Sequence, residues 1–254
     1  RTGTEDAASG RNDPRDRVIT ALAFSPDGRY IAISTLAGTL ICSYPDWEVV
    51  AEIVVKAYAL SFSSSGKWLA LEDKTSLQLW DLDPVRCSWS HSASFEIEFT
   101  CFAIQQDEFI FCGTAIGDIE RLEIKTGGWS RWFDSLAPDC DLRDPLSGKS
   151  QKLAAFQQNN EYRDNMFDHP YCLCGLPDGK NLLCLYSNGI LACISTVNKE
   201  VEECVLIHEP VPSSACFSPD GTWLGISLSG GSLKILDLEQ FSVVTERKCA
   251  PYLL

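Results

Sequence analysis

The stretch ALAFSPDGRYIAISTLAGTLICSY, from Ala21 to Tyr44, decides the fold of this 254-residue chain. It contains an apolar run, the turn Ser-Pro-Asp-Gly at residues 25–28, a second apolar run, a glycine turn at Gly38 and a third run. Pro-Asp-Gly reverses a chain tightly, because Pro fixes φ and Gly tolerates a positive φ. Short runs rich in Ile, Val, Leu and Phe fit strands that are buried on both faces. The stretch therefore predicts three antiparallel strands.

The same layout recurs in four further segments, which begin at Ala59, Thr100, Leu173 and Ala215. The two turn glycines stand ten residues apart in the pairs 28/38, 179/189 and 221/231, and Asp107 stands ten residues before Gly117. A fourth run follows each segment, at residues 47–54, 86–89, 128–133, 201–206 and 241–245. Four strands in every roughly forty residues predict an all-β fold, a β-propeller of four-stranded antiparallel blades. A sandwich would not keep the turn spacing over so long a stretch.

The repeats divide the chain into a tail or linker at residues 1–17 and a propeller at residues 18–254. Five blades are recognisable, at about 18–56, 57–93, 94–133, 171–208 and 209–247, and the full ring can hold six or seven. The step from the third to the fourth blade is nearly twice the usual period. We expect residues 134–170 to form an inserted loop with a short helix at 151–158, and a degenerate blade is the alternative.

The composition of the chain indicates which classes of partner and which cellular compartment to expect. Asp and Glu number 35 against 21 Lys and Arg, a net charge of −14, which disfavours nucleic acid and membrane surfaces as partners. The 12 cysteines form no Cys-x-x-Cys pair, and most lie in apolar runs. They are expected to be reduced thiols of a cytoplasmic or nuclear protein, not disulfides or zinc ligands. The chain starts with Arg and has a single methionine, Met166, so we expect it to be part of a longer protein.

The repeats resemble the WD-repeat β-propeller family. The resemblance rests on Phe-Ser-Pro-Asp-Gly at residues 24–28, on the same five residues at 217–221, and on Leu-Trp-Asp at residues 79–81. The family places a histidine about nine residues before the second of these motifs, where His208 stands, and it hydrogen-bonds within the blade to a residue such as Ser227. The blade-forming residues that the resemblance implies are Trp80, Asp81, Gly28, Gly179, Gly221, His208, Ser227 and Asp237.

The sequence offers little catalytic chemistry. Residues 147–150, Ser-Gly-Lys-Ser, copy the end of a phosphate-binding loop, but Arg143 occupies the place of its first glycine. Residues 225–230 do not match the Gly-x-Ser-x-Gly turn of hydrolases. The three histidines, His91, His169 and His208, have no neighbouring ligand pattern. We therefore predict no catalytic residues, no cofactor and no metal, and a protein that is not an enzyme.

The predicted function is a noncatalytic scaffold domain that binds other proteins or peptides within a larger intracellular protein. This is what the resemblance implies, since WD-repeat propellers mostly act as platforms. The alternatives are the sensor propeller of a NACHT-type signalling ATPase and, from another class, a propeller hydrolase or its gating domain. Candidate partner-binding residues are two tryptophans and the acids that follow them: Trp129, Trp132, Asp139, Asp141 and Asp144.

The ends of the repeat region bear on ring closure. Residues before Val18 are polar and include Pro14, so they make a poor outer strand for the last blade. The fifth blade already has its own fourth run at 241–245. We therefore expect an incomplete or weakly closed ring that exposes apolar blade faces and self-associates.

Overall fold

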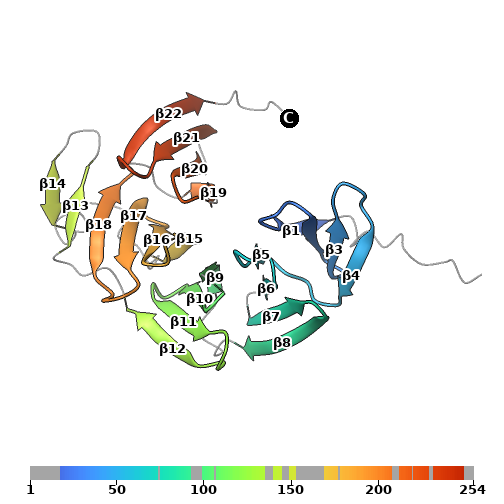
Figure 1. Ribbon diagram of the computed structural model, residues 1–254. Coiled ribbons are helices and arrows are strands. Elements are labelled where there is room, and N and C mark those ends of the chain that lie inside the picture. The colour runs from blue at the N-terminus through green and yellow to red at the C-terminus, as the bar shows by residue number, and fades with distance from the viewer. Residues whose placement is uncertain are drawn as a thin grey trace, which may run out of the picture.

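The computed structural model describes residues 18–248 except 74, 93–98, 106, 135–139, 145–148, 153–168, 177, 208–211, 219 and 229–230. Most of the described residues lie in strands, and no helix occurs among them. The strands form five sheets that stand around an axis as the blades of a β-propeller (Figure 1). The predicted fold class is therefore confirmed.

Each blade contains four consecutive strands, numbered from the inside of the ring outward. Blade one contains β1 (Ile19–Phe24), β2 (Tyr30–Thr35), β3 (Thr39–Ser43) and β4 (Val49–Ile53). Blade two contains β5 (Ala59–Phe62), β6 (Trp68–Glu72), β7 (Ser76–Leu82) and β8 (Val85–Ser92). Blade three contains β9 (Phe99–Gln105), β10 (Phe109–Thr114), β11 (Ile119–Glu123) and β12 (Trp129–Phe133). Blade four contains β15 (Pro170–Gly175), β16 (Asn181–Tyr186), β17 (Ile190–Ser195) and β18 (Val201–Leu206). Blade five contains β19 (Pro212–Phe217), β20 (Trp223–Leu228), β21 (Ser232–Asp237) and β22 (Ser242–Lys248).

The turn between the first and second strands explains why the repeat needs its glycines. Gly28, Gly179 and Gly221 have φ of 69°, 69° and 70°, in the left-handed region that favours glycine. In blade three Asp107 takes this place with φ 54°, as the ten-residue spacing predicted. Asp tolerates this conformation better than most residues, so the turn survives the loss of glycine.

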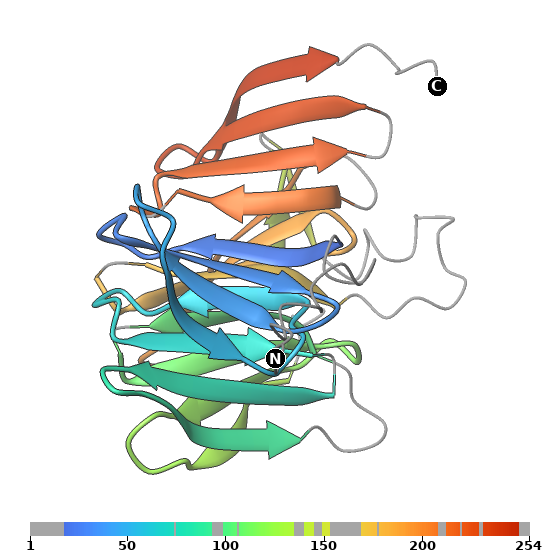
Figure 2. The ribbon, with the colours of Figure 1, turned by 90° about the vertical axis from the view of Figure 1, so that its right-hand side faces the viewer.

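Hydrogen bonds link two turns at one end of every blade. The residue after the first-turn position accepts, through its carbonyl, a hydrogen bond from the N–H of a residue at the end of the third strand or just beyond it. The donor and acceptor pairs are Tyr44 to Arg29 (2.7 Å), Leu82 to Lys67 (3.0 Å), Ile124 to Glu108 (2.8 Å), Thr196 to Lys180 (2.7 Å) and Leu238 to Thr222 (2.9 Å). We call this end of the propeller the paired-turn end. Figure 2, a side view, shows the turns gathered at the two ends of the blades.

The core lies between the blades, because central strands such as β10, β16 and β17 are buried on both faces. In β10, Ile110 and Cys112 pack in the cluster shared with blade two, whereas Phe111 packs in the cluster shared with blade four. In β16, Cys184 faces blade three and Leu183 faces blade five. Alternate residues therefore fill alternate interfaces, as the continuous apolar runs predicted.

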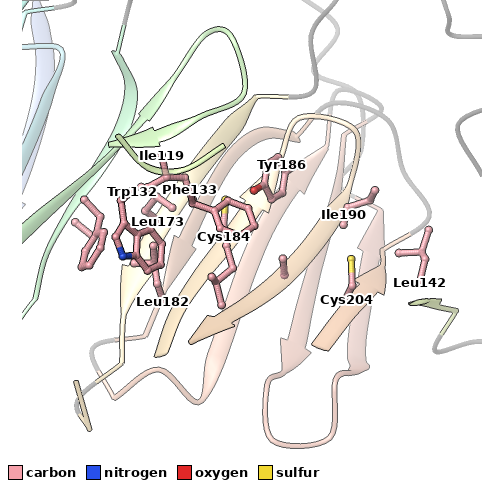
Figure 3. Close-up of a cluster of buried hydrophobic side chains, with 14 of the residues drawn as sticks. Ile119, Trp132, Phe133, Leu142, Leu173, Leu182, Cys184, Tyr186, Ile190 and Cys204 are labelled. Atoms are coloured by element: carbon pink, nitrogen blue, oxygen red, sulfur yellow. The ribbon is translucent and has the colours of Figure 1, made fainter. Parts of the chain in front are cut away.

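A hairpin from residues 134–170 extends the sheet of blade four. Strand β13 (Asp141–Arg143) pairs with β14 (Ser150–Lys152) and lies parallel to β18, with Arg143 opposite Val205. Leu142 of this hairpin is buried in the cluster of blades three and four (Figure 3). The expected helix at 151–158 is wrong for its first two residues, which are in β14 because the hairpin ladder pairs them. Residues 153–158 lie outside the described part of the chain.

The ring is open between its last and first blades (Figure 1). The first strands of consecutive blades contact one another from β1 to β5, β9, β15 and β19. Within the described residues, no strand of blade five pairs with a strand of blade one, and each of these blades holds all four of its own strands. In the described part of the chain, one face of blade one and one face of blade five therefore have no neighbouring blade.

Candidate interaction surface

Trp132, a predicted partner-binding residue, lies in the core. It is 3% exposed and packs in the cluster of blades three and four, beside Leu173 and Leu182 (Figure 3). Its ring meets that of Phe111 edge to face, with centroids 4.8 Å apart. The prediction that Trp132 binds a partner is therefore wrong. A β-bulge lies in β12 between the pairs Ile119–Phe133 and Glu120–Arg131, so Trp132 has no ladder partner. Because the bulge breaks the alternation of the strand, the side chain of Trp132 is buried.

Trp129 is half-buried on the outer strand of blade three and holds two contacts. Its ring stacks on His91 of blade two, with centroids 4.1 Å apart and an interplanar angle of 15°. Its Nε1 donates a hydrogen bond of 2.6 Å to Oε2 of Glu120. These contacts fix the ring across the joint between blades two and three, so part of its surface already has a structural role.

Two of the three predicted acidic residues, Asp141 and Asp144, lie on the hairpin. Asp141 pairs with Lys152 at 2.8 Å, and the half-buried Asp144 follows β13. Asp139 lies outside the described residues. Arg143, between these acids, forms an ion pair of 2.6 Å with Glu203 of blade four. Asp141 therefore belongs to a salt-bridged outer edge of blade four.

Among the residues implied by the family resemblance, Asp81 and Asp237 hold turns, whereas Trp80 and Ser227 make contacts on strands. Nε1 of Trp80 donates to Gln78 (3.1 Å). The buried carboxylate of Asp81 accepts the N–H of Asp83 (3.1 Å), and Asp237 accepts two N–H groups in the matching turn of blade five. The hydroxyl of Ser227 donates to the carbonyl of Ser214 (3.4 Å). His208 lies outside the described residues, so its expected pairing with Ser227 stays a prediction.

A buried hydroxyl network in blade one escaped the sequence analysis. The Ser34 hydroxyl accepts the N–H of Ala57 (2.7 Å) and the hydroxyl of Thr39 (3.0 Å), and Thr39 is also within 2.8 Å of the Val55 carbonyl. Both hydroxyls are fully buried. The network ties blade one to the segment that leads into blade two. The sequence signal that could have predicted this network is the pair of hydroxyl residues, Ser34 and Thr39, on either side of the turn at Gly38.

A second missed contact joins His169 to Ser187 in blade four. The His169 N–H donates to the hydroxyl of Ser187 (3.3 Å), and that hydroxyl lies 3.4 Å from Nδ1 of the histidine. The N–H of Ser187 donates in return to the carbonyl of His169 (2.9 Å). His169 is half-buried just before the blade's first strand.

The open face of blade one carries a cluster of exposed apolar side chains from β1, β4 and the turn before β4. Phe24 and Trp47 are each 56% exposed, and Tyr44 lies between them, with ring centroids 6.4 Å from Phe24 and 5.7 Å from Trp47, both edge to face. Leu22 and Val50 extend the surface along β1 and β4, each about half exposed. We call these five residues, with Val49, the blade-one face.

The paired-turn end carries carboxylates that stay ionised. The Ser25 hydroxyl, 2.6 Å away, together with the N–H groups of Arg29, lowers the pKa of Asp27 to about 2. In blade five the Ser218 hydroxyl lowers the pKa of Asp220 in the same way. These acids accept hydrogen bonds from their own turns, so they shape the turns and add negative charge to this end of the molecule.

Other classes of site have less support. Within the described ranges, no three His, Cys, Asp or Glu side chains are grouped so that they could hold a metal ion. No described segment is a helix of the length and hydropathy needed to span a bilayer. Burial raises the pKa of Cys193 and Cys204 to about 12, so these thiols are not activated nucleophiles.

Comparison with known proteins gives one family. The model of the family described as WD domain, G-beta repeat, matches residues 11–42, which include β1, β2 and most of β3. No curated protein matches the chain. This match at the start of the first blade and the five four-stranded blades together support a WD-repeat β-propeller.

Proposed function

We propose that this chain is a noncatalytic scaffold that binds another protein at its paired-turn end, inside the cell, as one domain of a larger protein. WD-repeat propellers generally hold other proteins. The observation that carries the proposal is the contrast at the paired-turn end between a constant backbone and variable side chains. All five blades repeat the same turn-to-turn hydrogen bond.

The side chains that this backbone presents differ from blade to blade. The residue that accepts the hydrogen bond is Arg29, Lys67, Glu108, Lys180 or Thr222 in turn. A rigid framework that displays different groups at equivalent places suits recognition, because binding then costs little ordering of the receptor. Binding of a partner by such a framework requires no catalytic side chain.

The net charge of the chain supports a basic partner, and its cysteines support a location inside the cell. A net charge of −14 favours a partner segment rich in Lys and Arg, and binding should weaken as salt screens the attraction. The ten cysteines whose side chains the structure describes are thiols and are not joined in disulfides. Free thiols are typical of reducing compartments, which supports a place in the cytoplasm or nucleus.

The test uses two exposed acids of the paired-turn end, Glu108 in blade three and Glu239 in blade five. Proteins retained by the immobilised chain are identified and then measured individually by titration calorimetry. The double variant E108K/E239K should weaken binding by at least about tenfold, because each reversal turns an attraction into a repulsion. Binding to the unmodified chain should also weaken as salt rises.

The matched control is E202K/E246K, which changes the net charge equally on the outer strands β18 and β22. It should bind like the unmodified chain. Equal loss in both variants would show that only overall charge matters. If no retained protein binds the chain with a defined stoichiometry, the proposal of a scaffold is refuted.

A further inference from the structure

The face of blade one that looks into the opening is built like the interior of the propeller. Two cross-strand rows cover it: Phe24, Ile31, Cys42 and Val49, and then Leu22, Ile33, Leu40 and Glu52. Seven of these eight side chains are apolar. The opposite face of the same blade, with Ala32 and Ile41, is covered by blade two.

Its apolar character continues beyond the strands. Tyr44 and Trp47, in the turn before β4, lie with Phe24 in a chain of edge-to-face contacts. Ile31 and Cys42 lie in the same row as Phe24 and are buried although no blade covers this side. The surface is therefore an ordered cluster with buried residues beneath it, and not a set of scattered apolar side chains.

The open face of blade five is chemically different. Its rows are Trp223, Asp237 and Ser242, then Cys216, Gly225, Ile235 and Thr245, and then Ser214, Ser227, Leu233 and Arg247. Among these eleven residues the large apolar side chains are Trp223, Ile235 and Leu233, and Asp237 and Arg247 carry charges. Contact of blade one with blade five of another copy would set an aromatic cluster against a face with several hydroxyls, an aspartate and an arginine.

We propose that the blade-one face is the self-complementary interface of a homodimer, in which it meets the same face of a second copy around a two-fold axis. An isologous contact places apolar rows against apolar rows, and two-fold dimers are the commonest symmetric assemblies. The two rows carry only Glu52 as a charge, at their outer end, so the pairing of like with like brings few equal charges together.

The area is sufficient for a weak, specific dimer. Three aromatic and three aliphatic side chains, each about half exposed, leave roughly 500 Å² of apolar surface on each copy. Two copies would bury roughly 1,000 Å², which is the lower end of specific interfaces. Tyr and Trp at the centre of such a contact are the residue types that contribute most to binding.

Overall charge gives the interface a recognisable signature. Two chains of net charge −14 repel each other, and salt screens this repulsion. An apolar contact should therefore become tighter as salt rises. Binding of a basic partner at the paired-turn end should become weaker instead, so the two proposals respond oppositely and can fail separately.

The experiment is sedimentation velocity of the full chain between about 1 and about 200 μM, at low and high salt. The unmodified chain should pass from monomer to dimer, and more completely at high salt. Leu22→Glu should raise the dimer dissociation constant by at least about tenfold, because it buries a charge without a partner. Val50→Glu is a second variant at a site on β4, with the same expectation.

The matched control is Leu233→Glu, which puts the same charge on the open face of blade five, where Leu233 is 38% exposed. It should dimerise like the unmodified chain. Far-UV circular dichroism and thermal unfolding confirm that each variant is folded. A chain that stays monomeric at every concentration and salt overturns the proposal. So does a dimer that Leu233→Glu disrupts and Leu22→Glu leaves intact.

Discussion

Replacement of Trp132 tests whether the joint between blades three and four depends on this side chain. The residue is 3% exposed, and Trp132→Ala should lower the free energy of unfolding by about 3–5 kcal/mol. Of this, the edge-to-face contact with Phe111 accounts for about 0.5–1.5 kcal/mol. A loss of this size is a large fraction of the stability of an ordinary domain.

Trp132→Phe separates ring packing from the indole N–H. Nε1 of Trp132 is buried without a hydrogen-bond partner among the described residues. Phe keeps a ring against Phe111 and removes this N–H, whose burial costs about 1–3 kcal/mol. That gain offsets most of the packing that the smaller ring gives up, so the net change should stay within about 1 kcal/mol.

The assay is urea unfolding followed by far-UV circular dichroism, because each substitution removes a fluorophore. Trp129→Phe, on the same strand, is the control, and it should lose only the hydrogen bond to Glu120 and part of the stack on His91. If Trp132→Ala were as stable as the unmodified chain but failed to bind its partner, Trp132 would be a surface anchor and its burial would be refuted.

Three further outcomes can be measured on the same protein. The pKa of Asp27 is about 2 in the folded chain against an ordinary 3.8, and NMR titration should show it rising in Ser25→Ala. Because the folded-state pKa is lowered, the ionised carboxylate stabilises the fold at pH values above 3.8, and this stabilisation is lost as the pH falls towards 2. Iodoacetamide followed by mass spectrometry should label the exposed Cys87 in the native state and Cys204 only after denaturation; native labelling of Cys204 would contradict its burial. Leu142→Ser should speed hydrogen exchange in β13 and β14 but not in β16 and β17, and equal acceleration of both would mean that the hairpin supports the whole blade.

The repeat could be predicted from the sequence because its determinants are local. Pro-Asp-Gly at 26–28 and the glycine ten residues later fix two turns within one short stretch, and Asp107 could be placed by spacing alone. Strand type followed from apolar runs that fill both faces, as in β16 and β17. The fourth strands were also found, and residues 201–206 were predicted with the bounds that the structure has.

The candidate site was less predictable because it depends on register and on contacts between distant segments. Strict alternation gives no reason to bury Trp132 and Phe133 together, and only the bulge in β12 explains it. Pairing of β13 with β18 joins residues that are far apart in the chain, and nothing in either segment specifies the other. The blade-one face was predicted only in general terms, as an uncovered apolar side, because the aromatic contacts of Tyr44 and Trp47 arise from a turn.

That each blade is made of one continuous stretch has a consequence for how the protein is synthesised. Over residues 18–248 as described, no strand is exchanged between the first and last blades, so every four-stranded sheet closes on residues that leave the ribosome one after another. Low contact order is unusual for an all-β protein and favours fast folding, blade by blade from the N-terminus. The parallel pairing of β13 with β18 is the exception, since β13 must wait for most of blade four to emerge. Ribosome-bound chains that end just before β18 should therefore hold three folded blades and an undocked hairpin.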